Sequence, residues 1–294
     1  MNKSEEILDY LFDRYIYEVG CRAKNLFLYD VAIKYLEQSA ALGNVESLIE
    51  LGDIFYNAGS SDDLRNPEEI IQRDKSKALK FYEQAAEKKY PSAFNRLALI
   101  HFNEGNVEET YKYFQLTVDA YQEKLNSSFD AFTLKALAKA YEDLHFVERD
   151  KIKSKKLLQK FLEYYRLAFG MLTRLASDGD IEAFFELGEM YRVGNGVERS
   201  NSTALRMFEY AAIHGFKDTK IRAYINMAFI YKSDKNSNKF TGYLKKAAAH
   251  GDFFAMRHLW KYYADKNLAE SERWLKKSEE IQFEFLSSLK QKEF

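Results

Sequence analysis

The chain has 294 residues, of which 46% are hydrophobic and 30% charged, and its formal net charge is −1. This near balance of charge excludes an overall attraction to nucleic acid or to an anionic membrane. A single cysteine, Cys21, excludes an internal disulfide. The N-terminus lacks the basic and apolar stretches of a signal peptide. No stretch approaches the about 18 apolar residues of a membrane span. We therefore expect a cytoplasmic protein.

The first predicted element is a helix within residues 1–27. Apolar residues recur there at helical spacing, and we interpret this helix as an N-terminal cap. A second helical stripe follows over residues 32–40. No stretch of the chain shows the alternation with period two that marks a β-strand, so the pattern predicts an all-α fold.

Six further helices share one pattern. Each has a large apolar anchor, with a small residue four positions before it and a ring four positions after it. This spacing places the three side chains on one face of a helix, where the small residue lets a neighbouring helix approach closely. The anchors are Leu51, Leu97, Leu137, Leu187, Met227 and Leu259.

A second amphipathic helix follows each anchor helix. The second helices are predicted within residues 77–86, 110–118, 151–177, 203–212, 240–248 and 271–279, and a last stripe at 281–294 is interpreted as a C-terminal capping helix. Gly43, Gly179 and Gly251 precede three anchor helices at a common offset. Glycine suits the left-handed residue that ends a helix, so these positions predict short turns between hairpins.

These motifs resemble Sel1-like repeats, a family related to tetratricopeptide repeats. The best match reads Ala183…Leu187-Gly188…Tyr191, then Gly194-Asn195-Gly196-Val197, then Ala204…Phe208…Ala211-Ala212. The resemblance covers residues 28–280. It implies a right-handed superhelical solenoid of about six helix-turn-helix repeats, forming a single domain over 1–294 with capping helices at both ends. It also implies a scaffold for protein complexes, often bacterial, with no catalytic residues.

Several motifs allow a sharper interpretation beside a structural one. Gly194-Asn195-Gly196 follows a predicted helix and lacks the Gly-Lys-Ser/Thr of a phosphate loop, which favours a structural turn. Glu186 and Glu189 could act as an acid–base pair, but a solvated helix face is the favoured interpretation. Cys21 could be a nucleophile with a suitable histidine, although a buried or half-buried thiol is favoured.

The histidines form no recognised ligand set, and His101 occupies a ring position of the repeat, so packing explains it and no metal or cofactor is expected. A basic run could contact nucleic acid or an acidic partner, but a solvated helix is favoured because the lysines do not share one face. The run is Lys151, Lys153, Lys155, Lys156 and Lys160.

A partner-binding groove can be placed by analogy with tetratricopeptide geometry, in which the first helices of the hairpins line a concave surface. We predict binding at positions five and two residues before each anchor, and two and five residues after it. An apolar track runs through these positions, and the last two copies are basic. The predicted binding residues are Ile49, Asp53, Tyr56, Asn95, Phe102, Lys135, Lys139, Phe185, Glu189, Arg192, Arg222, Phe229, Lys232, Arg257 and Lys261.

The sequence thus predicts a non-catalytic scaffold or adaptor that holds a peptide, helix or loop of a protein partner in this groove. A narrower hypothesis is a bacterial inhibitor or immunity-type protein for a toxin or effector. Two alternatives from other classes stay open: a nucleic-acid-binding helical repeat protein, and a hydrolase with a site built on helix ends. Coverage of the predicted groove residues by the chain's own packing would also be consistent with the same fold.

Overall fold

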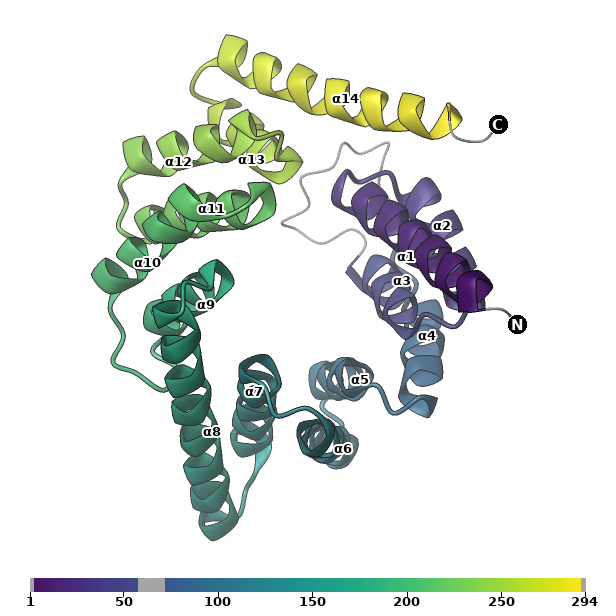
Figure 1. The fold of residues 1–294 in the computed structure, drawn as a ribbon, viewed down its shortest axis with the longest axis vertical. Coiled ribbons are helices and arrows are strands. Elements are labelled where there is room, and N and C mark those ends of the chain that lie inside the picture. Colours follow the sequence, from purple (N-terminus) through teal and green to yellow (C-terminus); the bar gives the residue numbers. More distant parts are fainter. Residues whose placement is uncertain (1–2, 58–71, 292–294) are drawn as a thin grey trace. The chain divides into compact units, whose positions relative to one another are not determined.

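A computed structural model describes residues 3–57 and 72–291, with side chains described from Phe12 onward. Within these residues the chain forms α-helices joined by turns, as predicted for an all-α protein (Figure 1). The helices are α1 Lys3–Asn25, α2 Tyr29–Ala41, α3 Val45–Asn57, α4 Lys75–Glu87, α5 Pro91–Asn103, α6 Val107–Ser127, α7 Ala131–Val147, α8 Lys151–Ser177, α9 Ile181–Val193, α10 Asn201–His214, α11 Lys217–Ser233, α12 Ser237–Ala249, α13 Phe253–Tyr263 and α14 Leu268–Lys290.

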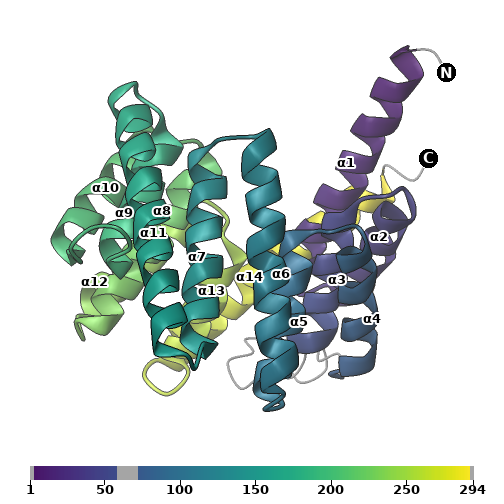
Figure 2. The same ribbon diagram turned by 90° about the horizontal axis from the view of Figure 1, so that it is seen from below.

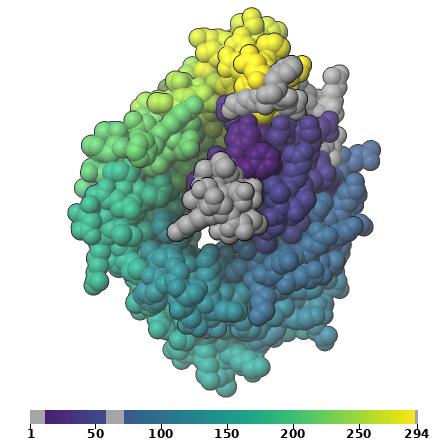
Figure 3. Space-filling view, turned by 45° about the vertical axis from the view of Figure 1, so that its right-hand side comes forward, coloured from purple at the N-terminus to yellow at the C-terminus, as the bar shows by residue number. Residues whose placement is uncertain are grey.

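The chain divides into two compact units, Met1–Phe129 with Ala136–Phe161 and Asp130–Lys135 with Leu162–Phe294. In the first unit the hairpins α1–α2, α3–α4 and α5–α6 pack successively against one another, and α3 to α6 are seen side by side in Figure 2. The same unit appears as adjacent bands from purple to blue in Figure 3. The second unit stacks α9–α10, α11–α12 and α13–α14. A single solenoid across residues 1–294 stays a prediction.

The repeat anchors form the core of these hairpins, which confirms the predicted pattern. All six anchors are buried, the most exposed being Leu187 at 5%. The residue after the anchor is glycine where a large ring of the second helix packs against it. A Cβ atom on Gly188 would lie 2.7 Å from the Phe208 ring, and one on Gly52 would lie 2.4 Å from the Tyr82 ring. Close approach of the two helices therefore requires glycine at both positions.

The predicted turns are also confirmed. Gly43, Gly179 and Gly251 have φ values of 104°, 90° and 83°, in the left-handed region that glycine adopts without strain. Gly194, with φ 93°, ends α9 in the same conformation, so the glycine motif after this helix is a structural turn. The helix that follows is capped by Ser200, whose hydroxyl accepts a hydrogen bond from the backbone N–H of Thr203.

The two segments predicted as terminal caps both form helices that pack in hairpins. Helix α1 forms a full hairpin with α2, and Gly20 of α1 meets Leu36 of α2 as Gly52 meets Tyr82, so α1 acts as a first helix of a repeat. At the other end, residues 281–290 continue α14 without interruption, because no glycine or proline stands near Glu280 to end it. Residues 292–294 of the predicted C-terminal helix lie outside the described residues.

Candidate functional site

The predicted binding residues lie on the first helices of the hairpins, α3, α5, α7, α9, α11 and α13. Position −2, two residues before the anchor, is the least accessible. Ile49, Phe185 and Arg257, all at position −2, are 7%, 4% and 0% exposed, so the expectation that these three would lie on an open surface is wrong. For Ile49 and Phe185 the reason is that position −2 faces the next hairpin. Phe185 packs in one cluster with Met227 of α11, and Ile49 packs in another with Leu97 of α5.

Buried Arg257 is stabilised by aromatic rings. Its guanidinium carbon lies 4.5 Å from the ring centroid of Trp260 and 5.8 Å from that of Phe253. Arginine is weakly hydrated for a cation, and its planar group can stack on aromatic faces, which makes such burial tolerable. Arg257 is therefore a structural residue of α13 rather than a surface contact.

In the first unit, several predicted binding residues join successive first helices. Asp53 of α3 accepts two hydrogen bonds from Arg96 of α5, at 2.8 and 3.0 Å, and a third from the hydroxyl of Tyr82, at 2.7 Å. Burial alone would lower the pKa of Arg96, but the hydrogen bonds and charge of Asp53 outweigh it and raise that pKa. Asp53 therefore links α3, α4 and α5.

A similar link connects α5 to α7. The Asn95 amide donates to the Asp143 carboxylate at 3.2 Å, and the Lys139 ammonium lies 2.8 Å from the same carboxylate. Burial raises the pKa of Asp143, while Lys139 and Asn95 act in the opposite direction. Tyr56 of α3 also accepts a hydrogen bond from the Asn103 amide of α5, at 3.0 Å.

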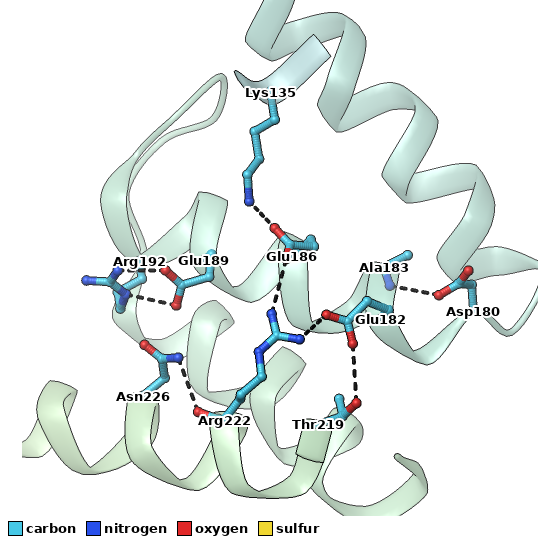
Figure 4. A network of polar contacts seen from close by, with 10 residues as sticks. All are labelled: Lys135, Asp180, Glu182, Ala183, Glu186, Glu189, Arg192, Thr219, Arg222 and Asn226. Atoms are coloured by element: carbon cyan, nitrogen blue, oxygen red, sulfur yellow. Dashed lines mark hydrogen bonds and ion pairs between the residues drawn. The ribbon is translucent and has the colours of Figure 1, made fainter. Parts of the chain in front are cut away.

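The second unit carries a denser network around Glu186 of α9 (Figure 4). Glu186 is 7% exposed, and its two carboxylate oxygens accept from Lys135 and from Arg222. Arg222 of α11 also pairs with Glu182 of α9 and lies over the Phe185 ring, with its guanidinium carbon 3.9 Å from the centroid. This glutamate network therefore joins α7, α9 and α11.

The network corrects the interpretation of Glu186 and Glu189 as a solvated pair. Glu186 is buried, whereas Glu189 is half-buried and forms two hydrogen bonds with Arg192 one turn away, at 2.7 and 3.2 Å. Each carboxylate is held by a cation, an arrangement that stabilises helix packing and suits neither residue to act as a general base. Lys135, Glu189, Arg192 and Arg222 accordingly have partners within their own unit.

A different group of side chains on α11 and α13 stays accessible. Phe229, Phe254 and His258 form an aromatic cluster with ring centroids 4.2 to 6.4 Å apart, and Phe254 is 38% exposed. The Lys232 ammonium lies 5.4 Å from the Phe229 ring centroid, and Lys261 is exposed on the same helix as Phe254. This aromatic cluster is apolar, partly open and flanked by positive charge.

The remaining candidates show structural roles. Cys21 is half-buried, and burial raises the pKa of its thiol, the opposite of the activation that a nucleophile needs. His101 stacks on Tyr113 with centroids 5.4 Å apart, as packing predicts. Among the residues whose placement is described, no group of three or more histidine, cysteine or acidic side chains could hold a metal ion. No helix in the described ranges is long and apolar enough to span a membrane.

Sequence reasoning missed Arg96, Tyr82 and His258. The sequence does contain a signal for Arg96. This residue stands directly before the buried anchor Leu97, where a charged side chain needs a partner, and Asp53 in the preceding copy has the opposite charge. His258 lies four residues after Phe254, one helical turn along the same face, so a wider search for rings on first helices would have included it.

Comparison with known proteins agrees with this repeat geometry. The Sel1 repeat family matches residues 15–44, 45–90, 134–169 and 181–216, and the first match includes the second half of α1. No curated protein sequence matches. A Sel1 repeat protein from Oxalobacter formigenes is similar at 19% identity, over 90% of this chain and 99% of that one, with a TM-score of 0.34.

Two further solved structures are similar. One is c5321, a protective antigen of uropathogenic Escherichia coli with an SLR fold, at 20% identity over 84% of this chain and 64% of that one, with a TM-score of 0.33. The other is Nro1, a hypoxic regulator of sterol synthesis described as a nuclear import adaptor, at 15% identity over 97% and 90%, with a TM-score of 0.30. The four matches to the Sel1 repeat family cover half of the sequence. The chain therefore belongs to this family, whose members are generally protein-interaction scaffolds.

Proposed function

We propose that the chain is a non-catalytic scaffold that binds a protein partner through the exposed surface of its first helices, with the aromatic cluster on α11 and α13 as the principal contact. The observation that carries this proposal is the exposure of Phe254 within a packed group of rings. Rings that are already held by their neighbours lose little conformational freedom on binding, which is why aromatic residues dominate the energy of many interfaces.

The charges around the cluster indicate the chemistry of the partner. Lys232 and Lys261 are exposed and lie on the two helices that carry the rings. Such a surface fits a segment that presents apolar side chains next to aspartate or glutamate. The hypothesis that this partner is a toxin or effector concerns its identity and stays a prediction.

Two of the predicted binding residues are unsuitable for a test because they have structural roles. Charge reversal at Arg222 or Arg257 would disturb folding, because Arg222 joins two helices and Arg257 is fully buried. Phe254→Ser alters the exposed ring of the cluster, and Lys261→Glu reverses an exposed charge on the same helix. Phe283→Ser is a matched control, since Phe283 is 72% exposed on α14.

The test is affinity capture from a native lysate with the wild-type chain and each variant, followed by quantification of the retained proteins. We expect one or more proteins to be retained by the wild type and by Phe283→Ser, and to be reduced about tenfold or more by Phe254→Ser combined with Lys261→Glu. Circular dichroism checks that all variants keep their helicity. Equal retention by the cluster variant would contradict the proposed site.

A further inference from the structure

The first unit holds an apolar pocket that the proposed function does not use. It lies where α5 and α7 end and α6 begins, and its volume is about 210 Å³. Two of its aromatic walls are open to solvent: Phe146 is 75% exposed and Phe102 46%, and their rings meet edge to face at 5.8 Å. The other residues that line it include Val107, Thr110, Val147 and Arg149.

Hydrogen bonds fix the segment that carries Phe146, one wall of this pocket. The His145 ring nitrogen lies 2.9 Å from the Ser154 hydroxyl, which ties the end of α7 to the first turn of α8. A hydrogen bond from Tyr111 of α6 to Glu148 holds the connection between α7 and α8 and contributes, after burial, to raising the pKa of Tyr111. The exposed Phe146 is therefore carried by a segment that is fixed on both sides.

Positive charge adjoins one end of the pocket. Arg149 lines it, and α8 begins two residues later with Lys151, Lys153, Lys155 and Lys156, all exposed. Residues 148–160 contain six basic and two acidic side chains. One of the two acids, Asp150, accepts hydrogen bonds from the backbone N–H groups of Ile152 and Lys153 as the cap of α8. Six basic against two acidic side chains leave this segment with a formal net charge of +4.

We propose that this pocket is a second docking site, which takes one bulky apolar side chain of a protein segment whose neighbouring residues are aspartate or glutamate. The apolar walls supply the contact for the side chain, and Arg149 with the lysines of α8 supplies the complementary charge. The volume is below the about 300–1,000 Å³ of sites that enclose a whole small ligand, which favours a single side chain over a free metabolite.

The test uses a fluorescein-labelled peptide with one phenylalanine between two pairs of aspartates, titrated with the full chain and followed by fluorescence anisotropy. Two comparison peptides replace the phenylalanine with alanine or the aspartates with asparagine. We expect the first peptide to bind, each comparison peptide to bind about tenfold more weakly, and added salt to weaken the binding.

Matched variants separate the pocket from general surface effects. Phe146→Ala, and Lys153→Glu with Lys156→Glu, should each weaken the binding about tenfold. The controls on α14 are Phe283→Ala and the charge reversal of Lys276 with Lys290. These should leave the affinity unchanged. Because the aromatic cluster on α11 and α13 suits the same peptide chemistry, every variant is also measured in a background of Phe254→Ser with Lys261→Glu, so that failure here is distinguishable from failure of the proposed function.

Four outcomes would overturn the proposal. They are no binding of the first peptide up to millimolar chain, equal binding of the alanine peptide, equal binding by Phe146→Ala, and tighter binding of a single-stranded oligonucleotide that displaces the peptide. The last result would assign the basic segment to nucleic acid instead. Circular dichroism of each variant ensures that a loss of binding reflects the surface and not the fold.

Discussion

The glutamate network of the second unit gives a sharp prediction about stability. Glu186 is buried, with 9% of its side chain exposed, whereas its cationic partners Lys135 and Arg222 are 31% and 45% exposed. Replacing both cations by methionine keeps most of their apolar stems and leaves the carboxylate without a partner of opposite charge. An uncompensated buried charge costs 3–5 kcal/mol, and the residual exposure of Glu186 places the expected loss near the lower end, about 3 kcal/mol.

Urea unfolding followed by circular dichroism measures this loss. Adding Glu186→Met to the double variant should bring the free energy of unfolding back to within about 1 kcal/mol of the wild type, because a buried ion network can be replaced by apolar side chains of similar volume. Lys112→Met with Arg273→Met is the control, since their ion pairs are exposed to solvent and their loss should cost much less than the loss at Glu186. A double variant at Lys135 and Arg222 no less stable than this control would refute the reasoning.

Three further predictions concern single contacts, each checked by urea unfolding. Gly188→Ala should destabilise by about 1 kcal/mol, because overpacking against the Phe208 ring exceeds the helix propensity gained, and the sign should reverse in a Phe208→Leu background. Tyr82→Phe should cost about 1–2 kcal/mol, because the buried ring loses its hydrogen bond to the Asp53 carboxylate. Asp252→Asn should stabilise at pH 7, because burial raises the pKa of Asp252 in the folded state. The folded protein then binds the carboxyl proton of Asp252 more tightly than the unfolded chain does, so the stability of the wild type falls as pH rises from the unfolded pKa to the folded pKa. The stability gained by Asp252→Asn should therefore vanish at pH values below the unfolded pKa. A gain that stays constant with pH would contradict burial of the charge as its cause.

The pattern of small and large residues predicted the hairpins and their core well. Anchors such as Leu187 repeat with fixed neighbours, and that repetition reflects a packing requirement that every copy shares. The apolar stripe of α1 predicts a helix but not its hairpin with α2. The signal for the hairpin is Val19-Gly20, which stands 32 residues before Leu51-Gly52. The extent of α14 was not predicted, because a repeat helix and a capping helix have the same backbone conformation and can form one continuous helix.

The candidate surface was less predictable, because helical periodicity gives the face of a side chain but not the distance to the next helix. Ile49 and Phe185, both at position −2, were expected on an open surface, yet the neighbouring hairpin buries them. Charges such as Asp53 looked available for a partner because their own partner, Arg96, lies 43 residues away in sequence. Only a structure shows that the opposite charge is within 3 Å.

The distribution of roles among repeat positions suggests how a Sel1 repeat chain can acquire partners without losing its fold. Position −2 and the linking charges are committed to stacking, so substitution there acts mainly on stability. In some copies the outer positions are exposed, as for Phe102 and Lys232 at position +5 and Phe254 at position −5. In others they are used for stacking, as for Arg222 and Glu182, which both stand at position −5 and pair between α11 and α9. Because each hairpin of a repeat protein is stabilised mainly by its neighbours, such exposed positions can change in one copy at little energetic cost to the others. The aromatic cluster and the apolar pocket share no residue, so variants of Phe254 and Phe146 should act additively on stability even if both surfaces engage the same partner.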